Sequence, residues 1–203
     1  MDTLTCLALN CSLKPDGRSN TDVLIRQTLD ALADHGVTGE VVRVAARDVH
    51  PGVTSEAQGP GDDWPALREQ VLAADILVLG TPIWLGNPSS VCRRVLERMD
   101  AFIAETDDDG RMVSFGKVAG VVVTGNEDGA HNVSAQLYQG LSDVGFTIPT
   151  NATTYWVGEA MGSVDYGDLD EVPDRVAATT SMMAANLAHL ARLLRDHPYP
   201  PVA

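Results

Sequence analysis

The run Ile76-Leu77-Val78-Leu79, closed by Gly80 and followed by the loop Thr81–Ser90, decides the fold of this chain. Four consecutive apolar residues before a glycine predict a strand that is buried on both faces. Comparable short strands are predicted at Leu4–Leu9, Glu40–Val44, Val118–Val123 and near Thr153–Val157, and segments with helical periodicity separate them. Five strands that alternate with helices predict an α/β domain whose parallel sheet carries helices on both faces.

The helices are predicted from apolar residues that recur at spacings of three and four positions. They are expected after the polar stretch Asn10–Thr21, near Ala66–Ala73, from Cys92 to Ile103, from Val133 to a stop at Gly145, and from Val172 to Arg195. Asn87 is the expected N-cap of the third helix, with Pro88 in its first turn. Because crossovers are right-handed, these elements favour a flavodoxin-like, doubly wound, five-stranded parallel sheet with strand order 2-1-3-4-5.

The 203 residues contain no internal repeat and no linker, so a single domain spanning 1–203 is expected. Residues 45–65 are rich in proline and glycine and form a loop long enough to act as a lid or an interface arm. The tail 197–203 holds prolines that cannot continue the last helix.

Acidic residues dominate the composition: 28 Asp and Glu against 14 Lys and Arg give a formal charge of −14. This balance disfavours nucleic acids and anionic membranes as partners, since both are bound through clustered basic side chains. The apolar runs are too short to span a bilayer, and Met1-Asp2-Thr3 lacks the basic start of a signal peptide. We expect a cytoplasmic protein whose cysteines, Cys6, Cys11 and Cys92, are reduced thiols.

Three loops rich in Gly, Pro, Ser, Thr and Asn follow the first, third and fourth predicted strands, at Asn10–Thr21, Thr81–Ser90 and Thr124–Asn132. In the order 2-1-3-4-5 these loops lie side by side at the switch point of the sheet, where ligands bind in open α/β folds. The sequence therefore predicts a ligand site formed by the three loops.

The first loop opens directly into a helix, whose free N–H groups and partial positive charge suit a phosphate. Ser12, Ser19 and Thr21 offer hydroxyls there, Asn20 an amide and Arg18 a fixed charge. An ordinary capped helix start explains the same residue types equally well. The loop matches neither GxxxxGK[ST] nor GxGxxG, which argues against ATP hydrolysis and against a Rossmann NAD site.

The second and third loops carry different chemistry. Ile83, Trp84 and Leu85 place apolar bulk where it can line a flat aromatic ring or a subunit interface, and both alternatives stay open. In the third loop, His131 is a candidate general acid, but capping the next helix or fixing the loop is the simpler role. The pair Glu127-Asp128 lacks a third ligand at metal spacing, so no metal site is predicted.

With these motifs the chain resembles the NADPH-dependent FMN reductase family of the flavodoxin-like superfamily, from the first strand through the last helix. The most specific motif is Thr81–Gly86. The resemblance implies bound FMN, with the phosphate at the first loop and the isoalloxazine ring between the other two. The residues implied for the phosphate are Ser12, Arg18, Ser19, Asn20 and Thr21. Those implied for the ribityl chain and one side of the ring are Pro82, Ile83, Trp84, Leu85 and Gly86. Those implied for the other side of the ring are Thr124, Gly125, Asn126 and Gly129.

The chain departs from the family pattern at Trp84-Leu85, where many relatives carry a tyrosine followed by another residue. It also lacks the Thr/Ser-rich phosphate loop of electron-carrying flavodoxins and the cysteine cluster of iron–sulfur flavoproteins. These departures leave ring stacking open, and they favour the reductase branch over both of those relatives.

No catalytic side chain is predicted, because a flavin carries out the redox chemistry itself at N5. Cys11 near a helix start is a conceivable nucleophile, although an inert thiol is the simpler interpretation. We expect an FMN-dependent oxidoreductase that takes electrons from NADPH or NADH and passes them to a quinone, flavin, azo or nitro compound by a ping-pong scheme. The alternatives are an electron carrier that does not react with NAD(P)H and a degenerate assembly module.

The resemblance further implies a homodimer. Its candidate interface residues, which could equally be core residues, are the 45–65 arm, Trp64, Trp84 and Met182-Met183. Arg47, Arg93 and Arg94 are candidates to contact the nucleotide.

Overall fold

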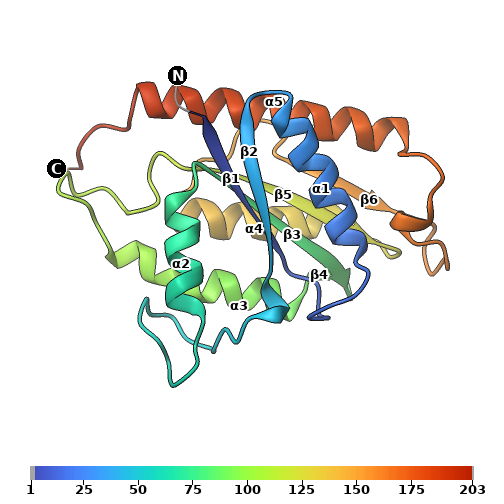
Figure 1. The fold of residues 1–203 in the computed structure, drawn as a ribbon, viewed down its shortest axis with the longest axis horizontal. Coiled ribbons are helices and arrows are strands. Elements are labelled where there is room, and N and C mark those ends of the chain that lie inside the picture. Colours follow the sequence, from blue (N-terminus) through green and yellow to red (C-terminus); the bar gives the residue numbers. More distant parts are fainter. Residues whose placement is uncertain (1–2, 203) are drawn as a thin grey trace.

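A central parallel sheet lies between two layers of helices in the computed structural model, which describes residues 3–202 (Figure 1). Its long strands are β1 (Leu4–Asn10), β2 (Val37–Arg43), β3 (Ile76–Trp84), β5 (Val118–Gly125) and β6 (Thr153–Val157), in the order β2-β1-β3-β5-β6. Every neighbouring pair in this order is parallel. The predicted order 2-1-3-4-5 is confirmed, because the two-residue β4 (Asn87–Pro88) takes a number but lies outside the order.

Both faces of the sheet are covered, as the apolar strands predict. On one face α1 (Asn20–Ala33) and α5 (Asp174–Asp196) pack in a cluster with Ala8 and Val78. On the other face α2 (Trp64–Ala73), α3 (Ser90–Met99) and α4 (Ala130–Asp143) pack in a cluster with Leu9 and Leu79. Short 3₁₀ turns lie at η1 (Val44–Ala46), η2 (Asp100–Ala104) and η3 (Tyr166–Asp168).

The segment after β3 differs from the prediction. The strand does not end at Gly80 but runs on to Trp84, and the chain turns back through Leu85 and Gly86, whose φ angles are 51° and 73°. Two consecutive residues with positive φ make a tight hairpin, so Asn87 and Pro88 pair with β3 instead of starting a helix. The predicted cap at Asn87 is therefore wrong: the N-cap of α3 is Ser89, whose Oγ accepts from the Cys92 N–H at 3.1 Å.

The long loop before α2 is attached to α3 by a buried ion pair. The Arg98 guanidinium donates to Asp62 Oδ2 at 3.0 Å and to the carbonyls of His50 and Glu56, and both charged side chains are fully buried. It also lies 5.5 Å from the ring centroid of Trp64. Trp64 is itself completely buried, so the core alternative holds for this residue and the interface alternative does not.

The C-terminal tail follows the last helix where the prolines predict. α5 ends at Asp196, and Tyr199 then packs against Phe115 with ring centroids 5.5 Å apart. Among residues 3–202, no helix has both the length and the apolar character needed to cross a membrane.

Candidate functional site

The loops that follow β1, β3 and β5 meet on the side of the sheet where α1 begins (Figure 1). The buried hydroxyls of Thr21 and Thr124 lie 2.8 Å apart and join the start of α1 to the end of β5. Ser89 Oγ donates to the carbonyl of Cys11 at 2.6 Å and joins the second loop to the first. The three loops are thus neighbours, as the strand order predicts.

Asn10, buried at the end of β1, organises the first loop. Its Oδ1 accepts from the Ser12 N–H at 3.0 Å and from the Ser12 hydroxyl at 2.5 Å. The Ser12 and Ser19 hydroxyls lie 2.6 Å apart, and Ser19 Oγ accepts from the Asp22 N–H at 3.1 Å. Ser19 is therefore the N-cap of α1, which confirms the capping interpretation. Capping and anion binding are compatible, because the first-turn N–H groups of a helix stay outside its hydrogen-bond ladder.

Glu127 fixes the tip of the β3–β4 hairpin to the third loop. Its carboxylate accepts from the N–H of Leu85 at 3.0 Å and from the N–H of Gly86 at 3.2 Å. Asn132 Nδ2 donates to the Gly86 carbonyl at 2.8 Å from the same side. Glu127, for which the sequence predicted no role, thus has a structural one. Within residues 3–202, no cluster of three or more His, Cys, Asp or Glu side chains is placed to hold a metal ion.

Gly86 and Gly129 bring the second and third loops into direct backbone contact. A Cβ added at Gly129, where φ is 132°, would lie 2.8 Å from the Gly86 Cα. Only glycine permits both this backbone conformation and this approach. These two residues hold the loops together, and neither lines the cavity that the loops enclose.

The three loops enclose a cavity of about 500 Å³, within the range of small-molecule sites at about 300–1,000 Å³. Eleven of the fourteen residues singled out from the sequence line it: Ser12, Arg18, Ser19, Asn20, Thr21, Pro82, Ile83, Trp84, Thr124, Gly125 and Asn126. Leu85, like Gly86 and Gly129, does not line it and has a side chain that is 90% exposed.

Four residues that line the cavity were not predicted from the sequence: Leu13, Lys14, Trp156 and Asp165. Lys14 adds a second cation beside Arg18. Trp156 lies on β6, whose carboxyl end is next to that of β5, and its ring packs on Tyr166 with centroids 5.4 Å apart. The strand order could have indicated Trp156, because it places the end of the fifth strand beside the third loop.

The arginines suggested for a nucleotide lie elsewhere. Arg93 bonds Gln136 and Asn87, and Arg94 donates to the Val49 carbonyl at 3.1 Å. Neither they nor the exposed Arg47 line the cavity. The cations of the cavity are Lys14 and Arg18 instead.

The two candidate catalytic side chains do not reach the cavity. His131 packs edge-on against Tyr155, whose hydroxyl lies 3.3 Å from its Nε2. The predicted capping role is wrong as well, since the N-cap of α4 is Gly129. Cys11 is fully buried, and hydrogen bonding to the Cys92 thiol together with burial raises its pKa. A thiol with a raised pKa is a poor nucleophile, so Cys11 has no catalytic role in this geometry.

The cavity fits a molecule with an anionic end and a flat apolar body. Lys14, Arg18 and the start of α1 supply cations and N–H donors at one end. Ile83, Trp84 and Trp156 supply apolar surface at the rest of the wall. Gly125 has no side chain, and a Cβ there would lie 3.0 Å from Ile83, so backbone borders the cavity closely. FMN has both parts, and this donor set suits it.

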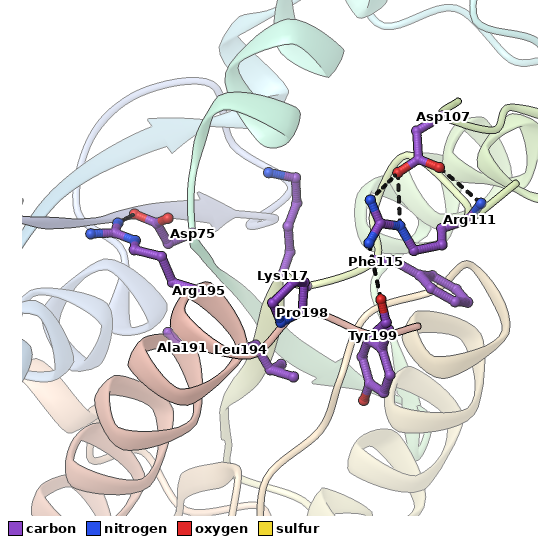
Figure 2. Close-up of a pocket in the computed structure, with 11 residues that line it drawn as sticks. Asp75, Asp107, Arg111, Phe115, Lys117, Ala191, Leu194, Arg195, Pro198 and Tyr199 are labelled. Carbon is purple, nitrogen blue, oxygen red and sulfur yellow. Dashed lines mark hydrogen bonds and ion pairs between the residues drawn. The ribbon is translucent and has the colours of Figure 1, made fainter. Parts of the chain in front are cut away.

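A second cavity, of about 220 Å³, lies at the amino ends of β3 and β5, which Asp75 and Lys117 directly precede, and is a poor candidate (Figure 2). Arg111 is paired with Asp107 at 2.9 Å, and Arg195 with Asp75 at 2.7 Å. Lys117 Nζ donates to the Ala74 carbonyl at 3.0 Å, and burial lowers its pKa. The charged groups of this cavity are thus occupied by one another and by the backbone, and its volume is below the ~300–1,000 Å³ that is usual for small-molecule sites.

Comparison with known proteins shows what this chain is similar to. The model of the family described as NADPH-dependent FMN reductase matches residues 4–162. The chain is 34% identical to the 8-demethyl-8-aminoriboflavin-5'-phosphate synthase of Streptomyces davaonensis, over 97% of the chain and 80% of the synthase. It is also 37% identical to a protein of Mycobacterium bovis named divalent metal cation transporter MntH. That match covers 96% of the chain but only 29% of the transporter's length.

Among solved structures, RosB with bound 8-demethyl-8-formylriboflavin-5'-phosphate has a TM-score of 0.85 and 33% identity, covering 97% of this chain and 82% of RosB. An archaeal flavodoxin has a TM-score of 0.60 at 8% identity, covering 93% and 99% of the two chains, and shows a common fold alone. The chain belongs to the NADPH-dependent FMN reductase family.

Proposed function

We propose that the chain holds FMN in the three-loop cavity and passes electrons from NAD(P)H to a small acceptor such as a quinone, a free flavin, or an azo or nitro compound. One observation carries the proposal: a single cavity combines Lys14, Arg18 and the α1 N-terminus at one end with Ile83 and tryptophan side chains elsewhere. Membership of the family supports the same cofactor.

In this proposal the protein binds and orients, and the cofactor supplies hydride and electron transfer. Arg18, Lys14 and the first turn of α1 hold the phosphate. Ile83 and Trp84 would offer the ring apolar surface, and the Gly125 backbone, which packs directly on Ile83, would let it approach closely. The electron donor and the acceptor would share the exposed face of the ring and bind in turn.

Anaerobic reduction of the purified protein tests the proposal. The protein, as isolated or after adding FMN, is expected to show a flavin absorption spectrum that NADPH or NADH bleaches within seconds and that a quinone restores. Flavin that only a chemical reductant bleaches would overturn the reductase assignment and leave an electron carrier. Protein that binds no FMN would overturn both and leave a non-catalytic module.

A second candidate function is that flavin is the substrate and the chain modifies it. The likeness to a riboflavin-phosphate synthase over 97% of the chain favours this alternative, and so does the TM-score of 0.85 with a structure that binds a flavin intermediate. Incubation with FMN in air, with an added amine as nitrogen donor, followed by mass spectrometry separates the candidates. The reductase returns FMN with unchanged mass, whereas a modifying enzyme yields a new flavin mass.

We also propose a cytoplasmic homodimer. The apolar side chains of Leu85 and Met161, 90% and 87% exposed, both flank the third loop, since their N–H groups bond Glu127 and Asn126. Exposed apolar side chains of this kind are typical of subunit interfaces, where a second copy would bury them. Sedimentation of wild type against Leu85→Asp tests this: wild type is expected as a dimer and the variant as a monomer. A monomeric wild type would contradict the proposal.

A further inference from the structure

The connection between β6 and α5 folds back over the start of α1. Asn126 bonds it twice, donating from Nδ2 to the Gly162 carbonyl at 2.8 Å and accepting at its own carbonyl from the Met161 N–H at 2.7 Å. Tyr166, almost completely buried, donates from its hydroxyl to Gln27 on α1. The turn Tyr166–Asp168 is therefore held in place beside two residues that line the cavity, Arg18 and Asn20.

The backbone of this turn fixes the orientation of the Asn20 amide. The Gly167 N–H donates to Asn20 Oδ1 at 3.1 Å. A planar amide that accepts on one side presents its two N–H donors on the other. Because Asn20 lines the cavity, those donors are left for a ligand that accepts hydrogen bonds.

The same turn also sets the place of the Arg18 guanidinium. Arg18 Nη1 lies 2.5 Å from Asp168 Oδ1. The rest of the guanidinium lies against Gly167, where an added Cβ would be 2.9 Å from Nη2 and 3.3 Å from Nε. The absence of a side chain at Gly167 thus gives the guanidinium its position at the cavity wall.

We propose that the turn Tyr166–Asp168 is the positioning element of the anion-binding end of the site: Gly167 and Asp168 hold Asn20 and Arg18 with their donors toward the ligand phosphate. This inference rests on the proposed FMN site and deepens it. The turn lies beyond the family match, which ends at residue 162. The sequence gives no local signal for it, since the two partners are 147 positions apart.

A double-mutant cycle on Arg18 and Gly167 tests the proposal. Gly167→Ala displaces only the far end of a flexible side chain, so the variant is expected to fold and to melt as wild type does. Its FMN dissociation constant should rise about fivefold, and that of Arg18→Ala about tenfold or more. In the Arg18→Ala background, Gly167→Ala should add nothing, because the added methyl acts through Arg18. Affinity for riboflavin, which lacks the phosphate, should stay unchanged in all variants.

Gly140→Ala on α4, where a Cβ meets Leu96 at an ordinary 3.4 Å, is the matched glycine control and should leave FMN binding unchanged. Gly167→Ala with wild-type FMN affinity would overturn the inference, as would losses that simply add in the double variant or that affect riboflavin equally. Wild-type protein that binds no FMN would instead overturn the proposed function itself, so the two failures are distinguishable.

Discussion

Two glycines with positive φ carry very different structural demands. Gly129 has φ 132° and no room for a Cβ against the Gly86 backbone, whereas Gly17 has φ 73° and open space around it. We expect Gly129→Ala to lower the free energy of unfolding by about 2–4 kcal/mol, from backbone strain and overpacking. Gly17→Ala, the matched control, should cost about 1 kcal/mol from strain alone. Denaturant titration of both variants measures this, and equal losses would show that the Gly86–Gly129 contact contributes nothing.

The cysteines should be unreactive in the folded protein. All three are buried, and burial raises the pKa of Cys6 from 9.0 to about 12. Thiolates are the reactive form, so a colourimetric thiol reagent at pH 8 should label none of them in native protein and three after unfolding. Rapid labelling of one thiol in native protein would reopen a nucleophilic role for Cys11.

At this scale the sequence predicts residue types better than their partners. Ser19 and Asn20 were recognisable as cap and ligand candidates because hydroxyls and amides at a helix start have few other uses. Glu127 was not, because its partners are the N–H groups of Leu85 and Gly86, more than forty positions away. Lys14 was not among the predicted site residues, and only its place in the cavity wall indicates a role.

Among the elements, the loop before α2 depends on the Arg98–Asp62 pair. Removing one partner of a buried pair leaves the other charge unpaired. We therefore expect Arg98→Ala to cost about 3–5 kcal/mol of folding free energy. Arg26→Ala, which breaks an exposed pair with Asp22, should cost well under 1 kcal/mol. Thermal or denaturant unfolding of both variants checks the difference, and a small effect at Arg98 would contradict the buried pairing.

The same pair predicts an acid transition. Burial alone would raise the pKa of Asp62, but N–H groups of Gln58, His50 and Trp64 and the Arg98 guanidinium lower it from 3.8 to about 2. A carboxyl group with a lower pKa in the folded state stabilises the protein above its unfolded pKa. That stabilisation is therefore lost as the pH falls from about 4 to about 2. Stability measured across this range should decline in wild type and more weakly in Asp62→Asn, and identical slopes would refute the assignment.

The helices and strands themselves were largely predictable, because apolar periodicity reports which faces are buried. The β3–β4 hairpin was not: Asn87-Pro88 has the composition of a helix start, and the positive φ of Leu85 opposes local preference. The role of residues 45–65 was also missed, since Arg98 lies on a helix that reads as amphipathic with charged residues outward. Its burial depends on Asp62, 36 positions earlier.

For the whole molecule, the alternation of five strands and helices is sufficient to predict the order of the sheet and the edge at which the three-loop cavity lies. The packing of the β6–α5 connection against α1 at that edge was not predictable. It depends on contacts such as Gln27 with Tyr166, 139 positions apart, which no local pattern records. Most lining residues of the three loops were therefore predicted, except Leu13 and Lys14, while Trp156 on β6 and Asp165 in the following connection were not.

Because the net charge is −14, the binding of an anion must depend on a few positive groups close to it. A phosphate approaching this surface meets repulsion at long range, which salt screens beyond about 10 Å. Lys14, Arg18 and the first turn of α1 line the cavity, so they oppose this repulsion only at short range. Affinity for a phosphorylated flavin should therefore depend on few side chains.

The central claim, that this cavity holds the FMN phosphate at the start of α1, is tested most directly by fluorescence titration of FMN into wild type and into Ser19→Ala/Asn20→Ala. The control is Ser181→Ala/Asn186→Ala, on α5, and circular dichroism verifies that each variant is folded. We expect the first double variant to bind FMN at least about tenfold more weakly than wild type, from the loss of two hydrogen bonds to a charged group, and the control to bind as wild type does. Unchanged FMN affinity in a folded Ser19→Ala/Asn20→Ala variant would contradict the account.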